Sequence, residues 1–310
     1  MGAEFVQLSL TPILIGVLAA VACALPGNFL ILRRQALIGD AISHVVLPGI
    51  VGAFLVTGVV ASVPMLIGAA CAALVAVILI EAIKRLGRIE PGAAMGVTFT
   101  ALFAAGVLLL EQTDTSSVHL DVEHALMGNL ESLIWFAATD GWASLADPAA
   151  LAALPPELIR IAVVCALVLA LTLVFWRPLK LSTFDEEFAN AVGIPTAALS
   201  LGLVVAAAVA AVAAFDAVGS IIVIAMFICP PAAARLMTDR LERQVVWSTG
   251  FAALSAVLGY VLAGYGPLWI GGTHAVSAAG MIATVSGVIL ALACLFGPHR
   301  TRVGVPRGAG

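Results

Sequence analysis

Charged residues are scarce in this sequence. Only 10% of its 310 residues are Asp, Glu, Lys or Arg, and 62% are hydrophobic. A soluble domain has about 25% charged and about 45–50% apolar residues. One globular core cannot hide so much apolar surface, so we expect lipid to be the solvent of the chain. The basic residues form no cluster that would indicate binding to nucleic acid.

The sequence also lacks the motifs of common catalytic sites. It has no GxxxxGK[ST] loop for nucleotide phosphates, no nucleophile elbow and no HExxH pair. Its five cysteines stand alone in apolar runs, without the spacing of a metal or redox motif. We therefore expect neither an enzyme nor a permanently bound cofactor. If ATP drives this protein, the ATPase must be a separate chain.

Long apolar stretches dominate what is present. Nine of them are long enough, or nearly so, to cross a membrane at about 1.5 Å per helical residue. They are 9–32, 38–57, 63–84, 93–111, 157–176, 196–214, 218–237, 247–265 and 275–297. We predict an all-α polytopic membrane protein with eight or nine transmembrane helices. It would form a single transmembrane domain over 1–310, with a flexible C-terminal tail from about residue 298.

Basic residues determine the expected orientation. All but Arg160 of the 14 Lys and Arg residues follow odd-numbered stretches. Positively charged loops stay in the cytoplasm, so we expect the N-terminus outside and the C-terminus in the cytoplasm. The outside loop at 112–156 is acidic and has no Lys or Arg. Such a mouth would attract cations, although the basic bias alone also predicts this composition.

Asp40 and His44 are the most informative residues. Four apart in the second stretch, they share one helix face, with Ser43 beside them. Ten helical residues counted from Arg34 put His44 about 15 Å deep, near the middle of a membrane. Ionisable groups at that depth usually mark a substrate or ion path, and carboxylate plus imidazole suits a divalent transition metal. A hydrogen bond between helices is the open alternative.

Two glycines and a proline predict an irregular second stretch. Gly39, Pro48 and Gly49 all lie within it. Proline removes one backbone donor and clashes with the preceding turn. We expect a broken helix here, with backbone carbonyls freed near His44.

Other polar residues are weaker candidates for a metal pathway. Asp216 lies at the expected outer turn between the sixth and seventh stretches. His119, Asp121, Glu123 and His124 gather at the outside mouth. This group would either accept metal transiently or simply be solvated.

A short cytoplasmic helix is predicted before the sixth stretch. Asp185, Glu186 and Glu187 put acids in its first turn, and Gly193 would end it. An amphipathic helix with an exposed Phe188 can dock into a groove on a partner protein. An ordinary polar loop is the alternative.

Four segments carry a family resemblance when taken in order. They are GDAISHVVLPG (39–49), HALMGN (124–129), FDEEFANAVGIP (184–195) and VGSIIVIAMFICPPAAARLM (218–237). Together they resemble the bacterial ABC-type permeases for manganese, zinc and iron, and the resemblance covers nearly the whole chain. It implies the permease subunit of an ATP-driven importer of a divalent metal, in the bacterial plasma (inner) membrane. By this resemblance the motif SHVVLPG (43–49) favours manganese as the substrate, and zinc and iron remain alternatives.

The resemblance also implies partners and roles. The expected partners are a cytoplasmic ATP-binding-cassette ATPase, an extracytoplasmic metal-binding protein and a second permease subunit, identical or not. Asp40 and His44 match the pair expected to contact the metal, which is substrate and not cofactor. Residues 184–195 match the segment that couples to the ATPase.

Three other functions stay open at this point. A secondary transporter or channel would need no ATPase, and inverted repeats with paired broken helices would favour it; no convincing repeat is visible. An ABC permease for a chelate, such as a siderophore, could manage without an intramembrane carboxylate and imidazole. A membrane scaffold would leave Asp40 and His44 with no role beyond helix packing.

Overall fold

The fold is built from long helices joined by short segments. A computed structural model describes residues 2–58, 62–112, 128, 130–269, 271 and 276–299. The long helices are α2 (Thr11–Leu32), α3 (Ile38–Thr57), α4 (Ser62–Gly87), α5 (Pro91–Gln112), α8 (Pro156–Val174), α11 (Thr196–Met237), α12 (Leu241–Trp269) and α13 (Ala278–Phe296). The short ones are α1 (Gly2–Phe5), η1 (Val6–Leu10), η2 (Leu130–Ser132), η3 (Gly141–Ala146), α7 (Pro148–Ala152), α9 (Trp176–Phe184) and α10 (Glu186–Ala191).

Nine helical segments in the described part of the chain are long and apolar enough to cross a membrane. They are Val6–Leu32, Ile38–Thr57, Pro64–Lys84, Gly92–Leu109, Pro156–Val174, Thr196–Phe215, Ala217–Met237, Leu241–Trp269 and Ala278–Phe296. Each overlaps one of the predicted stretches, so the all-α polytopic prediction is confirmed. A continuous helix satisfies its own backbone hydrogen bonds, which is what lipid requires.

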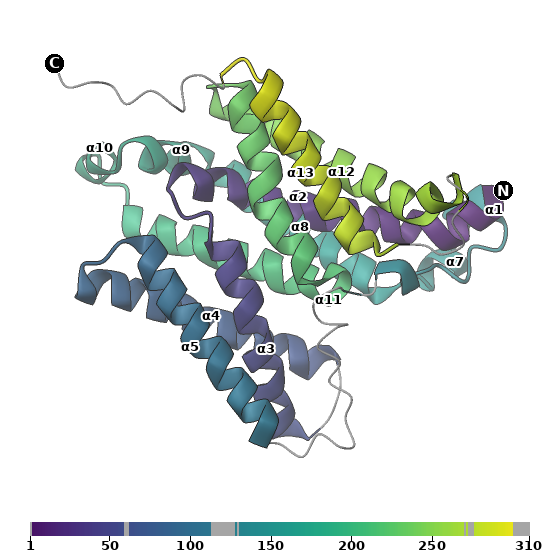
Figure 1. The fold of residues 1–310 in the computed structure, drawn as a ribbon, viewed down its shortest axis with the longest axis horizontal. Coiled ribbons are helices and arrows are strands. Elements are labelled where there is room, and N and C mark those ends of the chain that lie inside the picture. The colour runs from purple at the N-terminus through teal and green to yellow at the C-terminus, as the bar shows by residue number, and fades with distance from the viewer. Residues whose placement is uncertain are drawn as a thin grey trace.

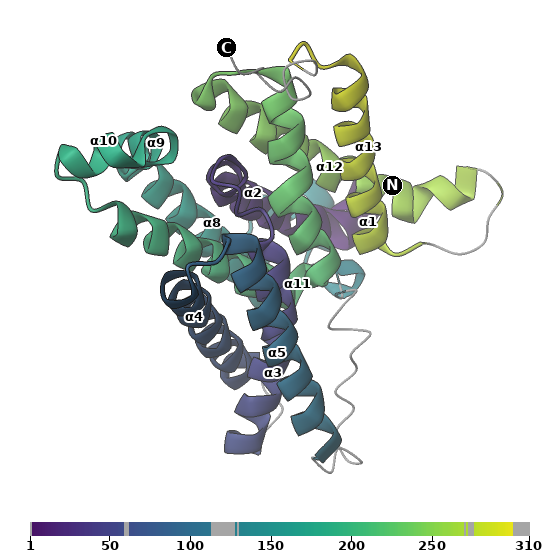
Figure 2. The same ribbon diagram turned by 60° about the vertical axis from the view of Figure 1, so that its left-hand side comes forward.

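The helices form two groups that lie side by side (Figures 1 and 2). In the larger group, α2 packs against α8, α11 and α12, and α13 packs against α11 and α12. In the smaller group, α3 packs against both α4 and α5. Contacts of α11 with α3 and α4 join the groups. The helix that carries Asp40 and His44 therefore belongs to the smaller group, but its first turns touch the larger one.

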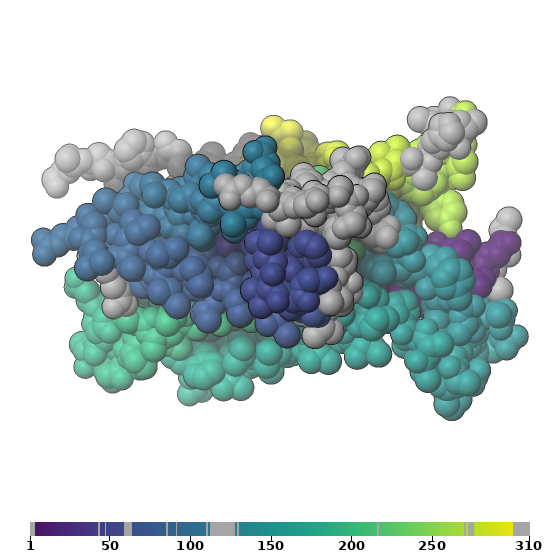
Figure 3. All heavy atoms as spheres, turned by 90° about the horizontal axis from the view of Figure 1, so that it is seen from below, coloured from purple at the N-terminus to yellow at the C-terminus, as the bar shows by residue number. Residues whose placement is uncertain are grey.

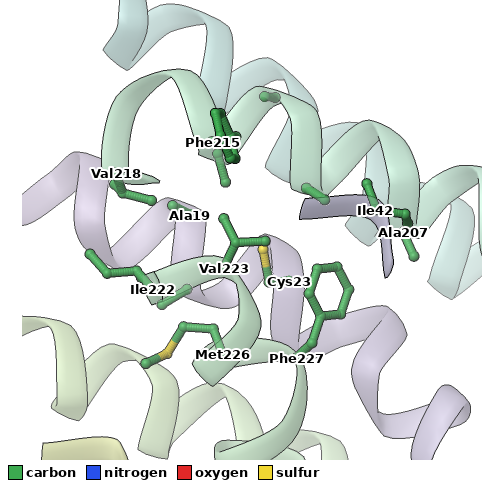
Figure 4. Packing of buried hydrophobic residues seen from close by; sticks show 14 of the residues in the cluster. Ala19, Cys23, Ile42, Ala207, Phe215, Val218, Ile222, Val223, Met226 and Phe227 are labelled. Carbon is green, nitrogen blue, oxygen red and sulfur yellow. The ribbon is translucent and has the colours of Figure 1, made fainter. Parts of the chain in front are cut away.

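Helix α11 is two membrane segments joined by a tight turn. Gly219 has φ 77° and ψ 172°, a combination that is essentially limited to glycine. The turn is enclosed by protein, because Val218 is fully buried and Phe215 nearly so. Figure 4 shows the side chains beside it, from Ala19 and Cys23 of α2 to Phe227 of α11. Alanine is the most frequent residue in this core. Its small side chain lets helices approach closely, and close packing drives helix association in lipid, where burial of apolar surface gives no advantage.

Helix α3 is continuous through Pro48, so the predicted break is wrong. Close packing accounts for the Pro–Gly pair. A Cβ on Gly106 of α5 would lie 2.6 Å from the Cβ of Pro48, and a Cβ on Gly49 would lie 2.6 Å from the carbonyl oxygen of Gly68 in α4. The pair therefore brings three helices together. Pro48 still has no N–H to donate, so the carbonyl of His44 lacks its usual donor in the helix.

The connecting segments gather at two opposite ends. At one end, which we call the basic end, Arg33 bonds to Ser182, and Asp239 pairs with His299. At the other end, Gln7 accepts a backbone hydrogen bond from Trp135. Figure 3 shows the N-terminal helix (purple) and the teal segment that includes 130–155 at one end of the molecule. Segments that follow odd-numbered spans thus meet at one end, as the alternation of basic residues predicts.

Candidate functional site

Asp40 and His44 lie together on α3, as their spacing predicts. The Nε2 of His44 is 3.4 Å from the Oδ1 of Asp40, one helical turn away. The side chains are 27% exposed at Asp40 and 37% exposed at His44. Asp40 is in the first turn of α3, where the positive end of the helix dipole favours a carboxylate. The pair is therefore accessible in the single chain and not sealed in a core.

Two phenylalanines of α5 hold the imidazole of His44. Its ring stacks on Phe99 at 5.4 Å between centroids with an interplanar angle of 20°. It meets Phe103 edge-on at 5.5 Å and 76°. Sequence reasoning missed both residues, although their spacing of four predicts one helix face. These contacts restrict the ring and so favour one orientation of its nitrogens toward a ligand.

The opposite side of α3 is packed tightly against α11. A Cβ on Gly39 would lie 2.7 Å from the ring of Phe227. Only a hydrogen fits at that contact, so Gly39 is required for close approach of the two helices. The contact fixes the position of Asp40, which is the next residue along the chain.

The expected depth of His44 needs correction. Helical counting from Arg34 is wrong, because 33–37 form a turn and α3 begins only at Ile38. His44 is six positions after Ile38, which corresponds to about 9 Å along the axis of α3. The path from Arg34 to His44 is therefore not a continuous helix, and the count of about 1.5 Å per residue does not apply to all of it.

The described residues do not complete a metal shell. Among them, no group of three or more His, Cys, Asp and Glu side chains comes together. The backbone of Ser43 lies in α3, and the backbone of Asp216 lies in α11, shortly before the turn at Gly219. The mouth candidates His119, Asp121, Glu123 and His124 lie outside the described residues. Asp40 and His44 thus offer two donors, and further donors would come from water or another chain.

The predicted short helix at 185–193 is confirmed. Asp185 is its N-cap, and its Oδ1 accepts a hydrogen bond of 2.8 Å from the backbone N–H of Phe188. Glu186 and Glu187 occupy the first turn. Gly193 has φ +87° and donates to the carbonyl of Asn190, which closes the helix as a C-terminal glycine should.

Helix α10 exposes a large apolar side chain, that of Phe188. Its side chain is 53% exposed, although it is a large apolar group at the basic end. Ala189 beside it is fully buried and anchors the helix to the protein. The helix therefore presents an aromatic ring outward on a fixed base, a suitable shape for docking into a groove.

Comparison with known proteins places this chain among transporters. The profile of the ABC 3 transport family matches residues 6–135 and 149–297, which is most of the sequence. The chain belongs to this family. The family resemblance predicted from the four motifs is thereby confirmed.

Individual relatives agree with the family assignment. The permease is 41% identical over 283 residues to the manganese transport system membrane protein MntD of Bacillus subtilis, covering 91% of this chain and 90% of the relative. It is 38% identical over 292 residues to the zinc transport system membrane protein TroD of Treponema pallidum, covering 92% and 73%. These relatives favour a permease subunit over a scaffold or a transporter that works alone.

Solved structures share the fold. PsaBC from Streptococcus pneumoniae in complex with Fab superposes with a TM-score of 0.72 at 27% identity, covering 94% of this chain and 93% of that one. An inward-facing putative metal-chelate type ABC transporter superposes with a TM-score of 0.65 at 15% identity, covering 94% and 87%. The second likeness concerns the fold alone.

Proposed function

We propose that the permease imports a divalent transition metal ion, with manganese favoured over zinc and iron. The observation that carries this proposal is the Asp40–His44 pair, held 3.4 Å apart and accessible on α3. One carboxylate and one imidazole suit manganese, iron and zinc alike, so the donors support the class of ion. MntD, the relative named for manganese transport, supports the choice within that class.

In the proposed mechanism the permease binds metal and a separate protein supplies the energy. A cytoplasmic ATP-binding-cassette ATPase docks on α10 and hydrolyses ATP. Its closure moves α10 and the helices connected to it, which switches access to Asp40 and His44 between the two faces of the membrane. The exposed ring of Phe188 and the capped ends of α10 support this docking site.

The remaining partners follow from the same proposal. An extracytoplasmic metal-binding protein delivers the ion at the end opposite α10. A second permease subunit supplies further donors, because the described residues of one chain bring no third His, Cys, Asp or Glu to Asp40 and His44. The protein resides in the bacterial inner membrane with its N-terminus outside, its basic end in the cytoplasm and Asp216 near the outer part of the pathway. The acidic loop that contains His119, Asp121, Glu123 and His124 receives the ion.

Substitution of the metal donors tests the proposal. The complete transporter, reconstituted in vesicles with its ATPase and binding protein, is supplied with radiolabelled Mn²⁺ and ATP. Asp40→Asn and His44→Gln each replace a strong metal donor by a neutral amide with little change in volume. We expect uptake to fall more than tenfold for each variant, because an amide oxygen binds a transition metal much more weakly than a carboxylate or an imidazole does.

A matched control separates the metal role from general damage. His299→Gln removes a histidine that also pairs with an aspartate, 3.0 Å from Asp239, but lies outside the nine spans. This variant should import at the rate of the unaltered protein. Wild-type uptake by both Asp40→Asn and His44→Gln, at equal amounts in the membrane, would overturn the site assignment. Competition that is stronger from a siderophore chelate than from free Mn²⁺ would instead favour a chelate permease.

A further inference from the structure

Arg33 connects the end of α2 to the segment that leads into α10. Its Nε donates to the Oγ1 of Thr183 at 3.0 Å, and its Nη2 donates to the Oγ of Ser182 at 2.8 Å. Both acceptors lie in the last turn of α9, where their hydroxyls also bond back to the carbonyl of Leu179. One guanidinium thus spans two elements that are about 150 residues apart in sequence.

Backbone hydrogen bonds hold the turn that follows Arg33. Gln35 donates to the carbonyl of Leu30 at 2.8 Å, and Arg34 donates to the carbonyl of Ile31 at 3.1 Å. Arg34 has φ 58°, so these bonds form the left-handed closure that ends many helices. Ile38 then donates to the carbonyl of Gln35 as α3 begins. Backbone hydrogen bonds therefore connect Arg33 to the start of α3, the helix that carries Asp40.

Electrostatics reinforce the connection on the side of α10. Burial lowers the pKa of the Arg33 guanidinium from its usual value, and the nearby Glu186 carboxylate acts in the opposite direction. Arg33, Glu186, Ser182 and Thr183 line one polar cavity at the basic end. The cation therefore faces the first turn of α10 as well as the last turn of α9.

Two other contacts of α9 do not involve the turn before α3. Lys180 pairs with Glu242 of α12 at 2.5 Å, but both side chains are about half exposed, and such pairs contribute little. Trp176 meets Phe29 of α2 edge-on at 6.0 Å. The Arg33 bonds differ because they hold the turn that continues directly into α3.

We propose that Arg33 is a positioning residue that transmits the movement of α10 to the metal donors on α3. Its role is to act through other residues. When the partner displaces α10, α9 carries Ser182 and Thr183 with it, and Arg33 conveys that displacement through the hydrogen-bonded turn to Asp40 and His44. This inference rests on the proposed function, because it assigns a path between the proposed docking helix and the proposed metal site.

Arg33→Gln tests the proposal in the complete transporter. Metal uptake and ATP hydrolysis are measured together in the same vesicles, along with the amount of ATPase bound. We expect binding of the ATPase and its basal hydrolysis to stay unchanged, while the number of ions imported per ATP falls at least tenfold. Arg33→Lys keeps the charge and one donor, so it should restore part of the ratio.

Arg34→Gln is the matched control. It removes the same charge from the neighbouring residue, whose side chain is exposed, and should keep the ratio of the unaltered protein. The paired change Ser182→Ala/Thr183→Ala should lower the ratio as Arg33→Gln does. All three changes together should add no further loss, because they interrupt one connection.

Several results would overturn the inference. They are an unchanged ratio in Arg33→Gln, an additive loss in the combined variant, equal loss in Arg34→Gln, or loss of ATPase binding in Arg33→Gln. The last result would make Arg33 a structural support for docking. Failure of the proposed function is distinguishable, because the unaltered complex would then import no metal at all.

Discussion

Phe188→Ala should separate docking of the ATPase from folding of the permease. The ring is 53% exposed on α10. A phenylalanine buries about 150–250 Å² in a complete contact, so a partner groove would cover roughly 100 Å² more of this side chain. At about 25 cal/mol per Å² the loss is about 2.5 kcal/mol, which corresponds to about 60-fold weaker binding.

The assay is binding of the purified ATPase to the permease in nanodiscs, with surface plasmon resonance as the readout. Thermal unfolding of the permease alone should change little, because the removed atoms are mostly exposed. Phe136→Ala is the control, since Phe136 is 72% exposed on the segment that bonds to Gln7 at the opposite end. Equal affinity of the ATPase for Phe188→Ala and the unaltered permease would refute the docking assignment.

Four further substitutions test backbone conformation and packing, and each is checked by the midpoint of thermal unfolding in detergent. Gly39→Ala should destabilise by about 1–3 kcal/mol, since its Cβ would lie 2.7 Å from Phe227. Gly52→Ala, whose Cβ meets nothing within 4 Å, should instead stabilise by about 1 kcal/mol, and equal effects of the two would contradict the packing argument. Arg34→Gly should stabilise by about 1 kcal/mol, because φ is 58° there. Gly193→Ala should destabilise by a similar amount at φ +87°, and no change would contradict a left-handed requirement.

Local chemistry explains what could be predicted from the sequence. The nine spans follow from apolar length, and α10 follows from an acid at its start and Gly193 at its end. Asp40 and His44 share a face because helical spacing requires it. Each of these predictions depends on residues that are close along the chain.

Long-range packing explains what could not be predicted. Pro48 predicts a break by local rules, but α3 is continuous through it and packs closely against Gly106 of another helix. Arg34 has a positive φ, a conformation that glycine usually adopts. The chain leaves the helix there, so the depth of His44 cannot be counted in helical residues from Arg34. The stacking of His44 on Phe99 joins two helices whose register no single sequence reveals.

The partial exposure of Asp40 and His44 bears on how long a bound ion would stay at this pair. A full shell with about 12 kcal/mol of binding energy corresponds to a Kd of about 1 nM. With association at about 10⁸ M⁻¹s⁻¹, the ion would leave only about once in ten seconds. If Asp40 and His44 hold the ion as proposed, two donors that remain 27% and 37% exposed would bind it more weakly than a full shell and release it sooner. The donors of one chain would then give a short dwell time, and each donor added by a second subunit would lengthen it.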